Sequence, residues 1–121
     1  MEIVSNVLEK ITIQLETQID EYIETYPAEP KILLMEIENN REFWMLGTGW
    51  QSMSFVYEHA QFSFLELCSL IDMICGVEAE QKFIREFTEE VKRITDGRVQ
   101  VYIYQNLENS KEKASCANSI A

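Results

Sequence analysis

His59 is the one histidine of the chain, and its neighbour Glu58 carries a carboxylate. A histidine can act as a general acid or base near neutral pH. A catalytic base also needs a group that orients it and a pocket that holds the substrate. The sequence around His59 indicates neither, so we predict that the chain has no catalytic residue and is not an enzyme.

The three cysteines are the next candidates for chemistry, because thiolates act as nucleophiles and bind metals. Cys68 and Cys75 lie seven positions apart in a stretch that we expect to be helical, so about 10 Å separates them along the helix axis. That distance is too long for a disulfide or for one shared metal ion. We therefore predict two core thiols, an exposed Cys116, no metal and no other cofactor.

A glycine-rich segment, Gly47-Thr48-Gly49, lies between two tryptophans. The backbone amides of such a turn can bind a phosphate or another anion. The segment lacks the spacing of a P-loop or of a dinucleotide-binding fingerprint, so a hairpin turn is the simpler interpretation. Tryptophan is enriched at binding hot spots, which leaves both core packing and ligand contact open for these side chains. If a small ligand binds, we expect a pocket at a subunit interface, lined by Trp44, Thr48, Trp50, Phe55 and Tyr57.

The composition limits the kinds of partner. The chain has 121 residues, which is typical of one domain, and its formal net charge is −11. Such a charge repels nucleic acid and anionic lipid, so we expect no direct nucleic-acid binding and no membrane binding. It keeps a small protein soluble, and it can also attract another protein, in particular a basic one.

The expected location is the cytoplasm. An odd number of cysteines, two of them in an apolar stretch, is typical of a reducing compartment. We expect no signal peptide, because no basic segment followed by an apolar run and a small-residue cleavage site opens the sequence.

Helices and strands must position these residues. Hydrophobic periodicity predicts three helices and four strands. In chain order they are a helix at 3–26 that ends before Pro27, strands at 31–37, 42–46 and 50–57, helices at 63–76 and 77–95, and a strand at 98–104. On the last helix, Glu78–Lys82 and Glu89–Arg93 have the favourable order for ion pairs one turn apart.

The helix expected at Ser63–Gly76 is the most apolar segment of the chain. Ser63 and Glu66 have the spacing of a capping box. Gly76 can close the helix, because glycine enters the left-handed conformation without strain. A helix that is apolar nearly all round must be buried on nearly all sides, so either other elements of the chain wrap it or a second subunit covers it. The other two helices each have a single apolar stripe and the sheet has few strands, which favours the second subunit. We therefore predict a homodimer, with the interface formed by Leu67, Leu70, Ile71 and Ile74.

These elements predict an α+β fold: a four-stranded, mostly antiparallel sheet and three helices, in the order α-β-β-β-α-α-β. Residues 1–104 are expected to form this single domain. Residues 105–121 are polar and show no periodicity, so we expect a disordered tail.

Two resemblances to known families can be stated. The segment Arg41–Tyr57 resembles the strand-Gly-Trp-strand core of the cyanobacterial element-excision controlling-factor family, with Phe43, Gly49, Trp50 and Gln51 at the matching positions. It covers well under half of the chain, and the later Lys-Ile-Trp-Ile strand of that family has no counterpart. The order of the elements, together with the acidity and the length, is similar to type III secretion chaperones, without a shared motif.

We expect a non-enzymatic, small acidic protein-interaction module, such as an adaptor, an inhibitor or a chaperone-like protein, that acts as a homodimer. The alternative is a regulatory protein that binds or sequesters a small ligand in a pocket at the subunit interface. A third hypothesis is an enzyme that uses His59 and a carboxylate.

Overall fold

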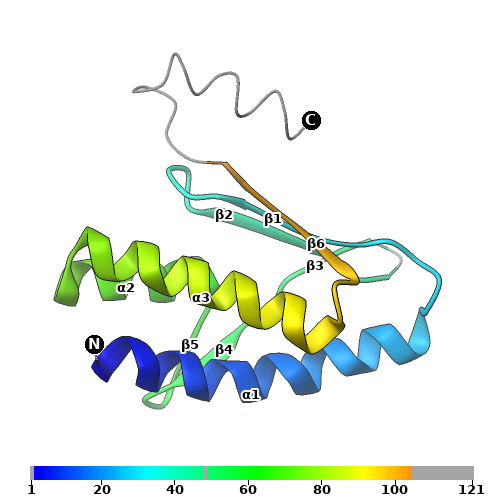
Figure 1. The fold of residues 1–121 in the computed structure, drawn as a ribbon, viewed down its shortest axis with the longest axis horizontal. Helices are drawn as coiled ribbons and strands as arrows, with labels where there is room; N and C mark the ends of the chain where they lie inside the picture. The colour runs from blue at the N-terminus through cyan, green and yellow to red at the C-terminus, as the bar shows by residue number, and fades with distance from the viewer. Residues whose placement is uncertain (1, 48, 105–121) are drawn as a thin grey trace.

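A computed structural model of the chain describes residues 2–47 and 49–104. It contains three helices, a four-stranded sheet and a separate two-stranded hairpin (Figure 1). The predicted α+β class and the predicted order of the elements are confirmed. In chain order the elements are α1 (Glu2–Thr25), β1 (Lys31–Glu36), β2 (Arg41–Met45), β3 (Trp50–Gln51), β4 (Phe55–Tyr57), β5 (Ala60–Phe62), α2 (Phe64–Cys75), α3 (Val77–Thr95) and β6 (Val99–Tyr104).

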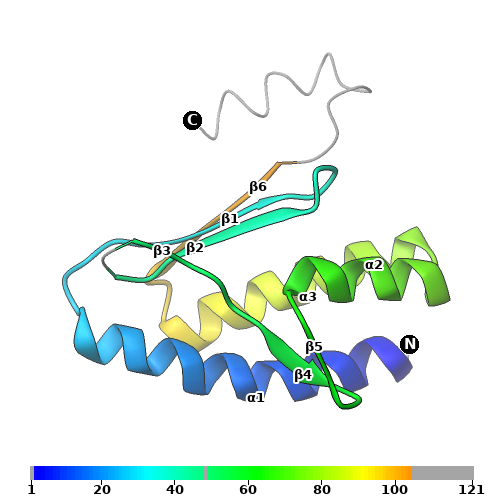
Figure 2. The same cartoon turned by 180° about the vertical axis from the view of Figure 1, so that it is seen from behind.

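The helices lie on one side of the four-stranded sheet. Helices α2 and α3 form the layer next to the sheet, and α1 lies beneath them together with the β4–β5 hairpin (Figure 1, Figure 2). Helix α1 contacts both α3 and β4, whereas α3 contacts β6 and α2 contacts β2. The core fills the space between these layers, because each layer presents its apolar side to the next.

The strand order in the sheet is β3-β2-β1-β6. The β1–β2 and β2–β3 pairs are antiparallel, as expected for a meander. The β1–β6 pair is parallel. A parallel pair requires a crossover, which the chain makes through the hairpin, α2 and α3 before it returns beside β1.

The prediction of one continuous strand at 50–57 is wrong. The strand stops at Gln51, and the chain enters a second sheet at Phe55. The cause lies in α1, where the Gln14 amide donates to the Val56 carbonyl at 2.9 Å and accepts from the Val56 amide at 2.8 Å. Gln18 donates to the Ser54 carbonyl at 3.0 Å. Two glutamines of a helix thus replace a neighbouring strand and hold this segment away from the main sheet.

The ends of α2 follow the predicted local signals, with one correction. The capping box is confirmed: the Ser63 hydroxyl accepts from the Glu66 amide at 3.2 Å, and the Glu66 carboxylate accepts from the Ser63 amide at 2.8 Å. Gly76 ends the helix at φ 100° and ψ 170°, which is not the left-handed helical conformation that we expected. Only glycine adopts this region readily, so the requirement for glycine remains.

The ion pairs predicted on α3 are wrong. Lys82 pairs with Glu86 at 2.8 Å, and Arg93 pairs with Glu90 at 2.6 Å. Several carboxylates lie within one turn of each cation, so spacing alone does not decide which of them is bound.

Phe87 on α3 joins the layers of the core. Its ring stacks on Phe64 of α2, with the centroids 3.8 Å apart and 16° between the planes. It also makes edge contacts with Trp44 of β2 at 6.3 Å and with Phe55 of β4 at 6.2 Å. All four side chains are completely buried. One ring therefore connects both sheets with the two inner helices.

We predict that Phe87→Ala lowers the free energy of unfolding by about 3–5 kcal/mol, because it removes a buried ring and leaves a cavity between four elements. Phe87→Leu should cost less, since it keeps most of the apolar volume. Urea denaturation followed by circular dichroism measures both. A loss below about 1 kcal/mol for Phe87→Ala would contradict this central position.

Candidate interaction surface

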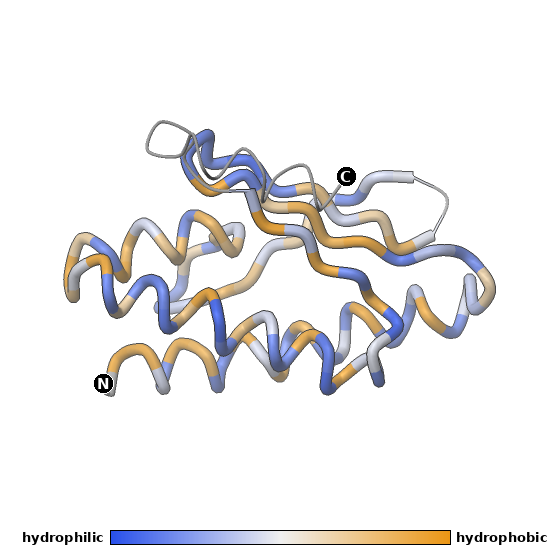
Figure 3. Tube along the Cα trace, turned by 45° about the horizontal axis from the view of Figure 1, so that its top comes forward, coloured by the Kyte–Doolittle hydropathy of each residue, from blue (hydrophilic) through white to orange (hydrophobic). Residues whose placement is uncertain are grey.

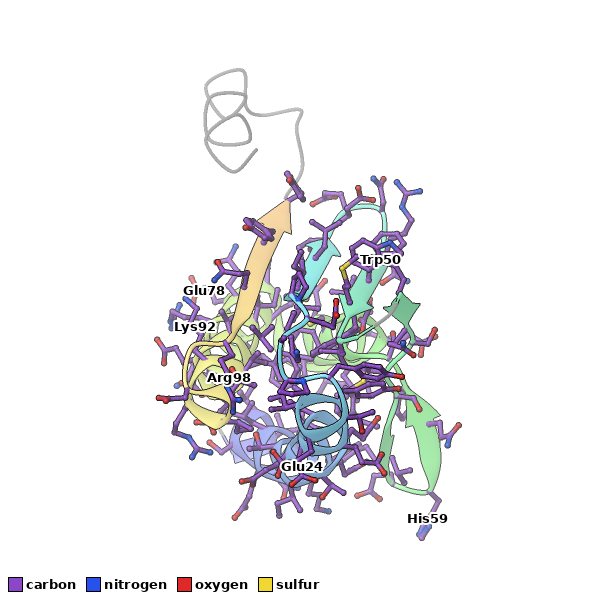
Figure 4. All side chains as sticks on the ribbon, turned by 90° about the vertical axis from the view of Figure 1, so that its right-hand side faces the viewer. Glu24, Trp50, His59, Glu78, Lys92 and Arg98 are labelled. Carbon is purple, nitrogen blue, oxygen red and sulfur yellow. The ribbon has the colours of Figure 1, made fainter. Side chains whose placement is uncertain are left out.

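The candidate residues for catalysis, Glu58 and His59, lie on the surface of the molecule. His59 is exposed at the tip of the β4–β5 turn and points away from the molecule (Figure 4). Glu58 and His59 have φ angles of 50° and 68°, the pattern of a two-residue type I′ turn. Within residues 2–47 and 49–104, no three histidine, cysteine, aspartate or glutamate side chains gather in a way that would hold a metal ion.

The two thiols inside the described residues are free. Cys68 is buried, and burial raises the pKa of its thiol, with Glu80 and Glu42 raising it further. A protonated thiol is a poor nucleophile, so Cys68 acts as a small apolar core residue. Cys75 is half-buried, and Cys116 lies outside the described residues.

The residues considered for a small ligand do not face one cavity in a single chain. Trp44 and Phe55 are completely buried in the core. Trp50 lies on the opposite face of the sheet and is 53% exposed. Tyr57 is half-buried on β4, with the Lys10 ammonium 5.4 Å from its ring centre. Thr48 lies outside the described residues, and a ligand site that uses these positions stays a prediction.

Gly47 is buried, and its lack of a side chain has a packing reason. A Cβ at this position would lie 2.6 Å from Cδ2 of Tyr26, which packs over the turn. At Gly49 a Cβ would meet no atom within 4 Å. The first glycine of the turn is therefore explained by the close approach of Tyr26.

We predict that Gly47→Ala lowers the free energy of unfolding by about 1–3 kcal/mol, because Tyr26 must move to admit the methyl group. Gly49→Ala is the matched control and should change it by less than about 0.5 kcal/mol. Thermal or urea unfolding distinguishes the two variants. Equal effects at both positions would contradict the proposed clash.

Glu42 is a partly buried carboxylate that faces the helical layer. It accepts hydrogen bonds from the Leu65 amide at 2.8 Å, the Phe64 amide at 3.4 Å and the Trp44 indole at 3.0 Å. Together with the capping box, it satisfies every free amide in the first turn of α2. Burial raises the pKa of Glu42, and these hydrogen bonds, which lower the pKa, offset the increase only in part. The group is thus bound in a structural role and fixes α2 to β2.

The raised pKa of Glu42 implies that its contribution to stability depends on pH. The folded chain holds this proton more tightly than the unfolded chain, so the stability that Glu42 contributes is complete below its ordinary pKa of 4.5 and is lost as the pH rises through the raised value. The quantity to compare is the difference in the free energy of unfolding between the native chain and Glu42→Gln. We predict that this difference, native minus variant, falls as the pH rises from about 4 to about 7. Urea denaturation of both proteins across this range measures it. A difference that grows with pH would show that the hydrogen bonds outweigh burial.

The predicted interface residues on α2 fall into two groups that differ in burial. Leu67 and Ile71 are buried in the core of the single chain. Leu70 is half-buried, and Ile74 is 59% exposed. Near Ile74, at the corner between α2 and α3, Met73 and Val77 are also exposed. We call Met73, Ile74 and Val77 the helix corner. The single chain thus covers more of α2 than the sequence suggested.

A second apolar surface was missed by sequence reasoning. It is the face of the sheet opposite the helices, where no described helix or strand lies over it (Figure 1, Figure 2). The register aligns its side chains in rows: Trp50, Met45 and Ile32 form one row, and Phe43, Leu34 and Tyr102 form the next. We call these six residues the outer sheet face. The edge of the Phe43 ring contacts Trp50, with the centroids 5.8 Å apart.

Among the described residues, the outer sheet face carries no unpaired charge. Beside it the register places Arg41 and Glu36, and their ion pair at 2.6 Å neutralises both. Gln100 and Tyr104 complete the rows and carry no charge. Figure 3 shows hydrophobic residues along the middle of the strands and hydrophilic ones at the β1–β2 turn. On a chain with a net charge of −11, this face is a neutral apolar surface.

In the described part of the chain, α1, α2 and α3 are all too short or too polar to cross a membrane. Comparisons with models of protein families, with curated proteins and with solved structures found no match, so they support neither of the two resemblances.

Proposed function

We propose that the chain is a non-enzymatic protein-interaction module, of the adaptor, inhibitor or chaperone-like kind, that acts as a homodimer. The observation that supports this proposal is the outer sheet face. A half-exposed tryptophan in contact with a phenylalanine, with the half-buried Ile32, Leu34 and Met45 in the same two rows, is typical of a surface that another protein covers.

A second copy is the occupant that the charges favour. Two chains of net charge −11 repel each other, so they can meet at low cost only where neither presents unpaired carboxylates. The outer sheet face meets this condition among the described residues, since the carboxylate of the adjacent Glu36 is bound by Arg41. Two such faces can stack about 10 Å apart, as sheets do in a sandwich. A two-fold axis would let Phe43 and Trp50 of each copy contact the other copy.

The dimer would leave other surfaces free for a partner. The three helices lie on the far side of the sheet, so the helix corner would stay exposed. The acidic surface around it would favour a partner with basic groups and speed its association. Location in the cytoplasm fits the free thiols and belongs to this proposal.

Sedimentation tests the homodimer. We predict that the native chain is a dimer at tens of micromolar and that Trp50→Glu raises the dissociation constant by at least about thirtyfold, because a buried tryptophan is lost and a charge enters the interface. Val56→Glu is the matched control: Val56 is 48% exposed on the β4–β5 hairpin, away from the outer sheet face, and should leave the dimer intact. A native chain that is monomeric at this concentration would contradict the homodimer.

A further inference from the structure

In the described part of the chain, strand β6 is an edge strand of the sheet. It pairs with β1 alone in the sheet. The Tyr104 carbonyl accepts from the Ile37 amide at 2.9 Å, so the backbone of Tyr104 faces β1. Backbone groups alternate along a strand, and the amides and carbonyls of Val101 and Ile103 therefore face the free edge. In Figure 4 β6 is the left-hand strand of the sheet, with α3 and Lys92 on the same side.

This edge lacks the features that usually prevent pairing. Natural edge strands are short, bulged, or protected by lysine or proline. Residues Val99–Tyr104 contain no charged residue and no proline, and their parallel register with β1 is uninterrupted over six residues. The edge therefore offers a regular row of donors and acceptors to another strand.

A groove lies beside this edge on the helical side. It has a volume of about 350 Å³, is partly open, and is bounded by α3 and by Ile103 of β6. Ile84 and Ile103 supply its apolar part, and Thr88 lies between the charged residues of α3. A strand added to β6 would direct every second side chain towards this groove.

The charge of the groove is opposite to that of the molecule. Arg85, Glu89 and Lys92 line it, which gives a net charge of +1 against −11 for the chain. Among the described residues, Lys82 and Arg93 on the same helix are bound by carboxylates, whereas Arg85 and Lys92 form no ion pair. At physiological ionic strength charges beyond about 8 Å are largely screened, so the groove's own Arg85, Lys92 and Glu89 set the charge that a ligand meets there.

We propose that β6 and the adjacent groove bind an extended segment of a partner protein by strand addition, with one apolar side chain over Ile84 and Ile103 and acidic side chains beside Arg85 and Lys92. This site rests on the proposed function as a protein-interaction module and specifies the chemistry of the segment that binds at β6, which differs from the basic groups favoured at the helix corner. Strand β6 of a second copy fits less well, because Val99–Tyr104 has no carboxylate to offer to the two cations.

The probe is a synthetic peptide with blocked ends, Ser-Glu-Thr-Val-Thr-Glu-Ser, whose alternate side chains are acidic, apolar and acidic. The control peptide, Ser-Lys-Thr-Val-Thr-Lys-Ser, replaces both glutamates by lysine. Nuclear magnetic resonance of the full chain reports on individual amides during the titration. We expect the acidic peptide to bind at least about tenfold more tightly than the control, and the amides of Val101 and Ile103 to shift and to gain protection from exchange.

Two pairs of variants separate the contributions of the backbone and of the charges. Ile103→Pro and Ile103→Ala both remove the side chain, but only proline removes the amide, so the proline variant should bind about three- to tenfold more weakly. The double variant Arg85→Glu with Lys92→Glu should lose at least about tenfold in affinity. Lys82→Glu with Arg93→Glu changes the net charge of the same helix equally outside the groove, and should lose less than about threefold.

Several results would overturn the strand-addition site. These are equal binding of the two peptides, shifts confined to other elements, or equal affinities of Ile103→Pro and Ile103→Ala. Protection of Val101 and Ile103 that depends on protein concentration without peptide would instead assign the edge to a second copy. Trp50→Glu should retain peptide binding. A native chain that is monomeric but binds the peptide would contradict the homodimer alone, and a native dimer that fails to bind the peptide would contradict this site alone.

Discussion

The stacked and edge contacts of Phe87 are the interaction on which the rest of the structure depends. The ring lies where the sheet, α2 and the β4–β5 hairpin meet, and it contacts Trp44, Phe55 and Phe64 at once. Close packing in a protein interior allows few alternatives to such an arrangement. The side of the sheet that faces Phe87 is therefore satisfied within one chain. On the other side, the outer sheet face, no helix or strand of the described residues packs against the sheet.

Two of the few cations, Lys31 and Arg41, have identifiable roles in the fold. Lys31 is buried, and its ammonium donates to the carbonyls of Tyr26 at 2.5 Å and Glu29 at 2.6 Å, close to the end of α1. A cation is favourable at that end of a helix, and α1 has no basic residue in its own last turn. Arg41 neutralises Glu36 beside the outer sheet face. Lys31 thus caps α1, and Arg41 neutralises the carboxylate beside the outer sheet face. Most acidic residues lie on the helices.

The sequence alone supplied the local structure and little of the candidate surfaces. Helix ends, the capping box of Ser63 and the strands β1, β2 and β6 follow from short-range signals, since caps and alternation act over a few residues. The apolar character of α2 was also evident, but it suggested an interface where the chain itself covers Leu67 and Ile71. Periodicity shows that a side chain needs burial, and it does not show which neighbour provides it.

Only the tertiary structure decided which tryptophan is buried and where the third predicted strand ends. Trp44 and Trp50 belong to adjacent strands, and the register places them on opposite faces. The strand break depends on Gln14 and Gln18, which come from a helix about forty residues away in sequence. Glu42 likewise caps α2 across the fold. Such contacts join residues distant in the chain, so propensity and spacing carry no information about them, whereas the α+β class and the order of elements were already determined by the sequence.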